Sequence, residues 1–124
     1  CQLVASCDLA YSTKEALFAT PGVNIGLFCS TPMVAVSRKV NRKPMMKMLL
    51  TGEPIKANYA KEIGLINDYY SKSKLNSEVL KLAKNIASKS NLTVKIGKQV
   101  RFLWVLINSE IYLLRTKPQS QLVI

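Results

Sequence analysis

Residues 48–67, which read MLLTGEPIKANYAKEIGLIN, constrain the fold of this chain more than any other segment. An apolar run leads to Gly52, and glycine commonly follows the end of a helix because it adopts a left-handed backbone conformation without strain. Glu53-Pro54 then turns the chain. A second helix is expected from about residue 56 to residue 62, with Gly64 ending it. The segment therefore predicts two short helices joined by a tight turn.

Short strands are expected before this segment, and helices on both sides of it. LAYST at residues 9–13 and ALFAT at residues 16–20 contain β-favouring side chains and predict two strands. The other expected elements, in chain order, are a helix at residues 1–8, an ordered loop at 21–31, helices at 31–40 and 44–51, a strand at 65–70, and helices at 77–88 and from about 91. The predicted fold class is α/β, helix-rich, with short strands near the N-terminus.

Three helix starts are predicted from capping residues. The Thr31 hydroxyl can accept a hydrogen bond from a free N–H group of the first turn, and Pro32 at the first helical position loses no hydrogen bond. Pro44 is expected to start the next helix. Asn76 is expected to cap the helix at residues 77–88.

The composition limits the kinds of partner. The length of 124 residues suits one domain, and 18 basic against 7 acidic residues give a net charge of +11. This charge suits an anionic partner, either nucleic acid or the phosphates of a cofactor, or a solvated lysine-rich surface. Because the basic residues are spread along the chain without interleaved aromatic residues, nucleic-acid binding is not expected. No apolar stretch approaches the roughly 20 residues that cross a bilayer, so no membrane span is expected.

The cysteines do not form a recognisable binding pattern. Cys1, Cys7 and Cys29 are an odd number without a CxxC pair, and histidine is absent. Neither a metal site nor a disulfide framework is therefore expected, and this usage fits a reducing compartment.

Three stretches, taken in order, carry a family pattern. They are residues 1–27, with their Phe-x-x-Pro motif at Phe18 and Pro21, residues 48–67, and the helix at residues 80–90. Together they resemble the crotonase, or enoyl-CoA hydratase/isomerase, family. The resemblance implies the C-terminal part of a ClpP/crotonase-like ββα spiral, assembled as a homo-oligomer of trimer type, that binds an acyl thioester of coenzyme A. The pattern is nearest to a mitochondrial branch of the family, which implies a mitochondrial protein of lipid and fatty-acid metabolism.

The resemblance does not extend over the whole chain. Residues 1–100 are expected to form the C-terminal part of a crotonase-like domain, and the chain is expected to be a fragment because Cys1 opens it inside an apolar run. From Arg101 the sequence RFLWVLINSEIYLLRTKPQSQLVI is apolar nearly all round and no longer follows the family. Residues 101–124 are therefore expected to be a divergent apolar tail.

The resemblance also implies a loss of chemistry. Family hydratases use two glutamates for proton transfer and two backbone N–H groups to stabilise the thioester oxygen. After the cysteine at the start of the first helix this chain has Gln2, whose amide is no proton acceptor near neutral pH. After the proline of Phe-x-x-Pro it has Gly22, which has no side chain. No catalytic residue is therefore assigned, and classical hydratase activity is not expected.

The expected substrate pocket consists of one residue of the first helix, one of the second strand and five of the loop at residues 21–31. These residues are Gln2, Phe18, Pro21, Gly22, Gly26, Cys29 and Ser30. A nucleophilic Cys29 is conceivable, but no histidine is present to activate it, and a packed cysteine is the favoured interpretation. No cofactor is expected, since the coenzyme A thioester is the ligand of the intact protein.

Three functions stay open at this point. The first is a crotonase-type protein that binds an acyl-CoA without hydrating it. The second is a family enzyme that performs a different thioester reaction with groups outside this sequence. The third is an assembly or interaction module with no catalysis, for which the apolar residues 92–124 are the motivation.

Overall fold

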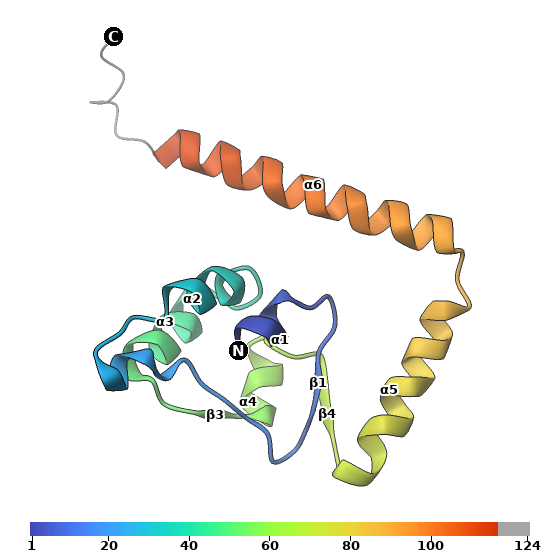
Figure 1. Cartoon of the computed structure of the whole chain (residues 1–124), viewed down its shortest axis with the longest axis horizontal. Helices are drawn as coiled ribbons and strands as arrows, with labels where there is room; N and C mark the ends of the chain where they lie inside the picture. Colours follow the sequence, from blue (N-terminus) through green and yellow to red (C-terminus); the bar gives the residue numbers. More distant parts are fainter. Residues whose placement is uncertain (117–124) are drawn as a thin grey trace. The chain divides into compact units, whose positions relative to one another are not determined.

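The computed structural model describes the backbone of residues 1–116 and the side chains of residues 1–108 (Figure 1). The chain divides into two units, Cys1–Lys81 and Leu82–Ile124. The predicted domain boundary after residue 100 does not coincide with this division or with the end of a helix, and it stays a prediction.

The first unit contains the strands and the shorter helices. Its elements are α1 (Gln2–Ser6), β1 (Tyr11–Thr13), β2 (Leu17–Phe18), the 3-10 helix η1 (Pro21–Ile25), α2 (Ser30–Ser37), α3 (Arg42–Thr51), β3 (Ile55–Lys56), α4 (Ala57–Glu62) and β4 (Asp68–Tyr70). β1 and β4 pair in parallel, whereas β2 and β3 pair antiparallel, with Phe18 opposite Ile55. Each strand thus pairs with a segment far along the chain, and β1 does not pair with β2, the strand that follows it. The α/β class with short strands is confirmed.

The segment that joins α3 to α4 adopts the predicted conformation. Gly52 lies in the left-handed region with a φ of 66° and donates its N–H to the Met48 carbonyl at 3.0 Å. Gly64 follows α4 with a φ of 79°. Both glycines end a helix in a backbone conformation that a side chain would strain, so the two predicted helix ends are confirmed.

The apolar core of the first unit is built by α2, α3, α4 and the strands around them. The buried apolar residues are Ala5, Phe18, Val36, Val40, Met45, Met48, Leu49, Ala57, Ala60, Leu65 and Ile66. On α3 the buried Met45, Met48 and Leu49 follow the helical spacing of one face, whereas Leu50 is exposed. The small Ala57 and Ala60 let α4 approach the core closely, since both are completely buried.

Two longer helices follow the first set of elements. α5 (Lys72–Ala87) has half-buried Leu75, Val79 and Leu82 on one face. α6 (Asn91–Thr116) begins where the last helix is predicted and runs without a break through Arg101. The change in composition at that residue is therefore not accompanied by a change in secondary structure.

Two helix starts and one loop differ from the predictions. α2 begins at Ser30 with Cys29 at the N-cap, so Thr31 lies inside the first turn and makes no capping hydrogen bond, and the helix ends at Ser37 and not at residue 40. α3 begins at Arg42, two residues before Pro44. Proline is tolerated throughout a first turn because those N–H groups have no helical partner, so it does not locate the first residue.

The other corrections concern η1 and α5. Part of the expected loop at residues 21–31 forms the 3-10 helix η1. Asn76 does not cap α5, because the Leu75 N–H already donates to the Ser71 carbonyl at 3.0 Å and the helix starts at Lys72. The preceding strand β4 ends at Tyr70, so α5 can begin at Lys72, four residues before Asn76.

The described residues contain neither a helix that is long and apolar enough to cross a membrane nor a cluster of three metal-binding side chains.

Candidate functional site

The segment from Phe18 to Ser30 contains six of the seven predicted pocket residues. Phe18 ends β2 and is buried, and its pairing with Ile55 on β3 sets where the segment leaves the core. Thr20 follows, and its buried hydroxyl has no hydrogen-bond partner among the described residues. Gly26 ends η1 with a φ of 76°, which directs the chain toward α2. The segment is therefore anchored at one end by the small sheet and at the other by a helix.

Gly22 and Cys29 lie in direct contact within this segment. The Gly22 N–H donates to the Cys29 Sγ at 3.2 Å, and the Gly22 carbonyl accepts the Leu27 N–H at 2.9 Å. The Cys29 carbonyl in turn accepts the Met33 N–H at 2.9 Å, which fixes the cysteine to the first turn of α2. This contact is a feature that the sequence did not predict.

Gln2, the seventh predicted pocket residue, lies in the first turn of α1 and is exposed. α1 packs against α2, the helix that begins at Ser30. Within the part of the chain that the structure describes, no hydrogen bond joins the Gln2 side chain to Gly22 or Cys29. The structure therefore brings Gly22 and Cys29 together, and among the residues it describes it shows no such hydrogen bond for the Gln2 side chain.

The chemistry available in this segment is restricted by its side chains. Residues 18–30, FATPGVNIGLFCS, include neither a carboxylate nor a basic side chain. Hydroxyl groups, one amide, one thiol and backbone groups remain, and at neutral pH these serve hydrogen bonding better than proton transfer. The segment is suited to holding a ligand by packing and hydrogen bonds.

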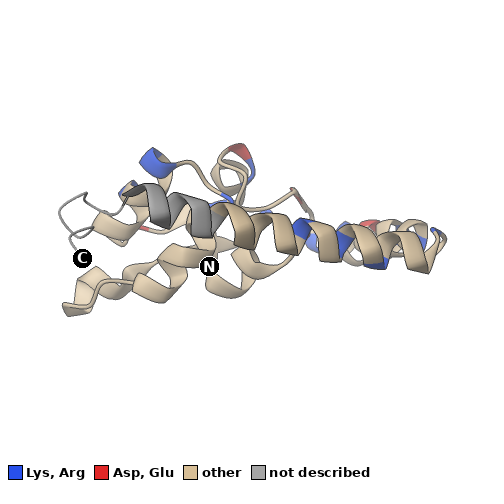
Figure 2. Cartoon of the chain, turned by 90° about the horizontal axis from the view of Figure 1, so that it is seen from above, with Lys and Arg blue, Asp and Glu red and all other residues tan. Residues whose placement is uncertain are grey.

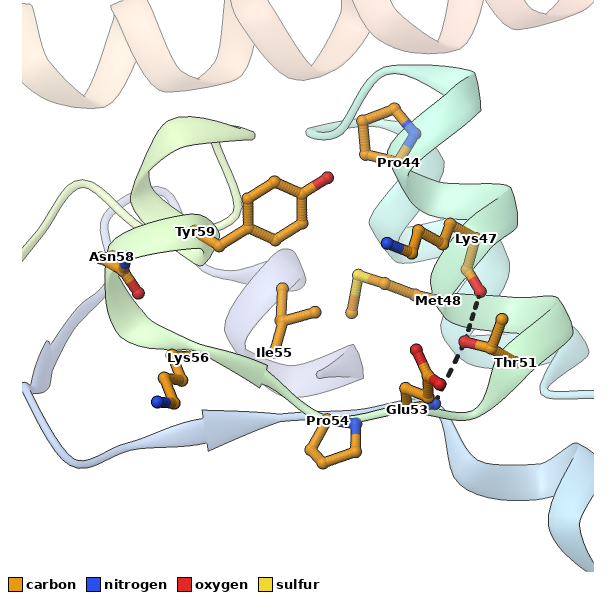
Figure 3. Close-up of a pocket in the computed structure, with 10 residues that line it drawn as sticks. All are labelled: Pro44, Lys47, Met48, Thr51, Glu53, Pro54, Ile55, Lys56, Asn58 and Tyr59. Atoms are coloured by element: carbon orange, nitrogen blue, oxygen red, sulfur yellow. Dashed lines mark hydrogen bonds between the residues drawn. The ribbon is translucent and has the colours of Figure 1, made fainter.

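A separate pocket of about 360 Å³ lies between α3 and α4 (Figure 3). Its lining residues are Pro44, Lys47, Met48, Thr51, Glu53, Pro54, Ile55, Lys56, Asn58 and Tyr59. The Thr51 hydroxyl donates to the Lys47 carbonyl at 2.8 Å and accepts the Glu53 N–H at 3.2 Å, which holds the turn at the edge of the pocket. Sequence reasoning missed this pocket, although the helix–turn–helix pattern of residues 48–67 was the signal that two helices meet there.

An ion pair fastens β4 to α4 in the same unit. The Lys61 ammonium donates to Asp68 Oδ1 at 2.8 Å, and the Tyr69 N–H donates to the same oxygen. The hydrogen bond from Lys61, followed by that from Tyr69, lowers the pKa of Asp68, and the hydrogen bond to Asp68 raises the pKa of Lys61. Both side chains are partly exposed, so the pair orients the strand end without burying a charge.

The positive charge of the chain is not concentrated at the candidate site. Figure 2 shows lysine and arginine on several helices, with few acidic residues between them. This distribution is typical of a solvated basic surface.

The chain belongs to the enoyl-CoA hydratase/isomerase family, whose sequence model matches residues 1–101. It is 50% identical over 100 residues to the enoyl-CoA hydratase domain-containing protein 3, mitochondrial, of Danio rerio. The match covers 81% of this chain and 35% of that protein. The chain thus spans about a third of the length of this relative.

Solved structures agree with the family assignment. The crystal structure of human enoyl coenzyme A hydratase domain-containing protein 3 matches with a TM-score of 0.81 and 47% identity, over 84% of this chain and 41% of that chain. The crystal structure of an enoyl-CoA hydratase from Mycobacterium smegmatis matches with a TM-score of 0.81 and 36% identity, over 97% of this chain and 50% of that chain. The predicted crotonase fold is confirmed.

Proposed function

We propose that the intact protein binds an acyl thioester of coenzyme A and does not hydrate it. The observation that supports this proposal is the segment from Phe18 to Ser30, which keeps the Phe-x-x-Pro motif but has Gly22 at the position of the expected acid. The other expected acid is replaced by Gln2. General acid–base catalysis typically contributes about 10²–10⁴-fold for each group, so the loss of both removes most of a hydratase's rate.

The cellular setting is proposed by resemblance. The Danio rerio relative carries "mitochondrial" in its name. On that ground we place the intact protein in mitochondria, and its membership of the enoyl-CoA hydratase/isomerase family is the ground for placing it in lipid and fatty-acid metabolism.

Isothermal titration of the intact protein with acyl-CoAs of short, medium and long chain tests the proposal. We expect at least one of them to bind with a Kd at or below about 100 μM, or about −5.5 kcal/mol. Free coenzyme A and the matching free fatty acid are the controls, and the thioester should bind more tightly than either. Absence of binding by every acyl-CoA would contradict the proposal.

The absence of hydration is a separate measurement. With crotonyl-CoA as substrate, the loss of absorbance at the enoyl thioester band should not exceed the rate without protein, while a family hydratase assayed beside it turns over. Measurable hydration would mean that groups other than residues 2 and 22 transfer the protons. Turnover of a different acyl-CoA in the same panel would favour the alternative of another thioester reaction.

An assembly role is the second candidate. Leu92, Ile96, Val100, Leu103 and Ile107 recur at helical spacing on α6 and are all exposed. A continuous apolar stripe of this kind is typical of a helix that packs against a partner. We propose that the intact protein is a homo-oligomer of trimer type and that this stripe, called the α6 stripe below, contributes to its assembly.

A further inference from the structure

We infer that Gly22 and Cys29 form a pair whose contact leaves no room for a side chain at position 22. Cys29 is then a positioning residue that, together with the Leu27 carbonyl, makes this position unavailable to an acid. The inference rests on the proposed function, because that proposal identifies position 22 with one of the glutamates expected in a hydratase.

The first step is steric. A Cβ atom at position 22 would lie 2.6 Å from the Leu27 carbonyl oxygen and 2.7 Å from the Cys29 Sγ. Real Cβ atoms essentially never approach other heavy atoms within 3.0 Å, so the surroundings would have to move. The Leu27 oxygen belongs to the backbone and cannot rotate away as a side chain does. Alanine is already too large at this position, and glutamate contains the same Cβ.

The second step is the hydrogen bonding that holds these neighbours in place. The Leu27 N–H donates to the Gly22 carbonyl at 2.9 Å, and the Gly22 N–H donates to the Cys29 Sγ at 3.2 Å. Cys29 is half-buried and packs against the core of the first unit. The sulfur therefore takes the space that a side chain at residue 22 would need and also binds the N–H group of the same residue.

The third step concerns the possible chemistry. Because the space next to Gly22 is filled, the expected acid cannot be restored by a single substitution while the segment keeps this conformation. Any carboxylate that transfers protons in a thioester reaction of the intact protein must then come from outside the segment from Phe18 to Ser30.

A double-mutant cycle tests the pairing in the intact protein. Thermal unfolding is measured for Gly22→Ala, Cys29→Ala and the double variant. Gly22→Ala should lower the Tm by more than about 5 °C, and the same change in the Cys29→Ala background should lower it by at least about 3 °C less, because one of the two obstructing atoms is gone. If the decreases in Tm of the two single variants simply add up in the double variant, the pairing is overturned. An unchanged Tm for Gly22→Ala would overturn it as well.

The chain offers matched glycine controls. A Cβ at Gly97 on α6 would meet nothing within 4 Å, so Gly97→Ala should leave the Tm unchanged or raise it slightly. At Gly26, in the same segment, a Cβ also has open space but the φ of 76° strains it. Gly26→Ala therefore reports backbone strain alone, and the decrease in Tm that it causes should be the same with and without Cys29→Ala.

Hydrogen exchange supplies a readout that does not require a folded Gly22 variant. The Gly22 amide should exchange about tenfold faster in Cys29→Ala than in the unmodified protein, whereas Cys29→Ser, which keeps an acceptor, should retain most of the protection. Equal exchange in all three proteins would overturn the hydrogen-bonded pair. None of these measurements involves a ligand. A negative acyl-CoA titration would therefore leave the Gly22–Cys29 pairing untouched, and a negative result for the pairing would leave the binding proposal untouched.

Discussion

At the scale of single residues, the glycines carry most of the information about this chain. Gly52 ends α3 with a φ of 66°, and a Cβ there would lie 2.8 Å from Asn24 Oδ1 and 3.0 Å from Val23 Cγ2. The end of α3 thus packs directly against η1, the middle part of the candidate site. A glycine that the sequence identifies as a helix end is also the contact that positions the site.

Gly52→Ala should destabilise the protein more than Gly26→Ala. The left-handed backbone costs an alanine about 1–2 kcal/mol at either position, and only at Gly52 is the contact with η1 added. We expect a loss of about 2–3 kcal/mol at Gly52 and about 1 kcal/mol at Gly26 in urea unfolding. Equal decreases in the free energy of unfolding for the two variants would show that the η1 side chains move aside at no cost.

The Lys61–Asp68 pair should make stability depend on pH at the acid end. The folded-state pKa of Asp68 is lowered, so its stabilising contribution is complete at neutral pH and is lost as the pH falls through that value. Asp68→Asn should therefore lower the urea midpoint at pH 7, and its effect should shrink as the pH falls below the ordinary aspartate pKa of about 3.9. In a Lys61→Gln background the effect at pH 7 should shrink, because the main hydrogen bond to the carboxylate is already missing. An effect of equal size at pH 7 and at low pH would contradict this account.

At the scale of elements, α3 supplies one buried face to the core of the first unit. Leu49 is 1% exposed and its neighbour Leu50 is 62% exposed, although both are leucines in the last turn of the same helix. The difference arises from the direction of each side chain around the helix, since consecutive residues point about 100° apart.

These two leucines form a matched pair for measuring the packing of α3. Leu49→Ala should cost about 2–5 kcal/mol in the free energy of unfolding, because it removes buried methyl groups and leaves a cavity. Leu50→Ala should change the same quantity by no more than about 0.5 kcal/mol. Urea unfolding of this chain measures both. A large loss at Leu50 would indicate that this side of α3 is covered in solution.

At the scale of the whole molecule, the chain matches only part of the architecture of its relatives. It spans 35% of its Danio rerio relative, and its long helix α6 carries an apolar stripe that the structure leaves exposed. Membership of the family explains the fold of the first unit, while the proposed assembly gives a reason for the α6 stripe.

Assembly through the α6 stripe should be sensitive to a single charge. Leu103→Lys, within the stripe, should shift sedimentation of the intact protein toward smaller species, because burying an ammonium group at an apolar interface is costly. Asn108→Lys adds the same charge away from the stripe and is the matched control. If both variants sediment like the unmodified protein, the stripe has no part in assembly.

The sequence by itself determined the local features of this protein. The ends of α3 and α4 at Gly52 and Gly64 were predictable because the conformational freedom of glycine depends on its own missing Cβ. The family was recognisable for the same reason, since residues 48–67 combine such local signals at fixed spacing. Helix starts were less predictable, because Pro44 is tolerated at several positions of a first turn and Asn76 was overridden by the strand before α5.

Only the tertiary structure decided which residues meet. The partners of β1 and β2 come from distant segments, and the pocket between α3 and α4 requires both helices to be placed. The absence of a side chain at Gly22 is visible in the sequence, but the sequence does not say what lies next to it. The Cys29 sulfur reaches Gly22 because η1 and the start of α2 fold toward each other, and this contact depends on the three-dimensional path of the chain between them.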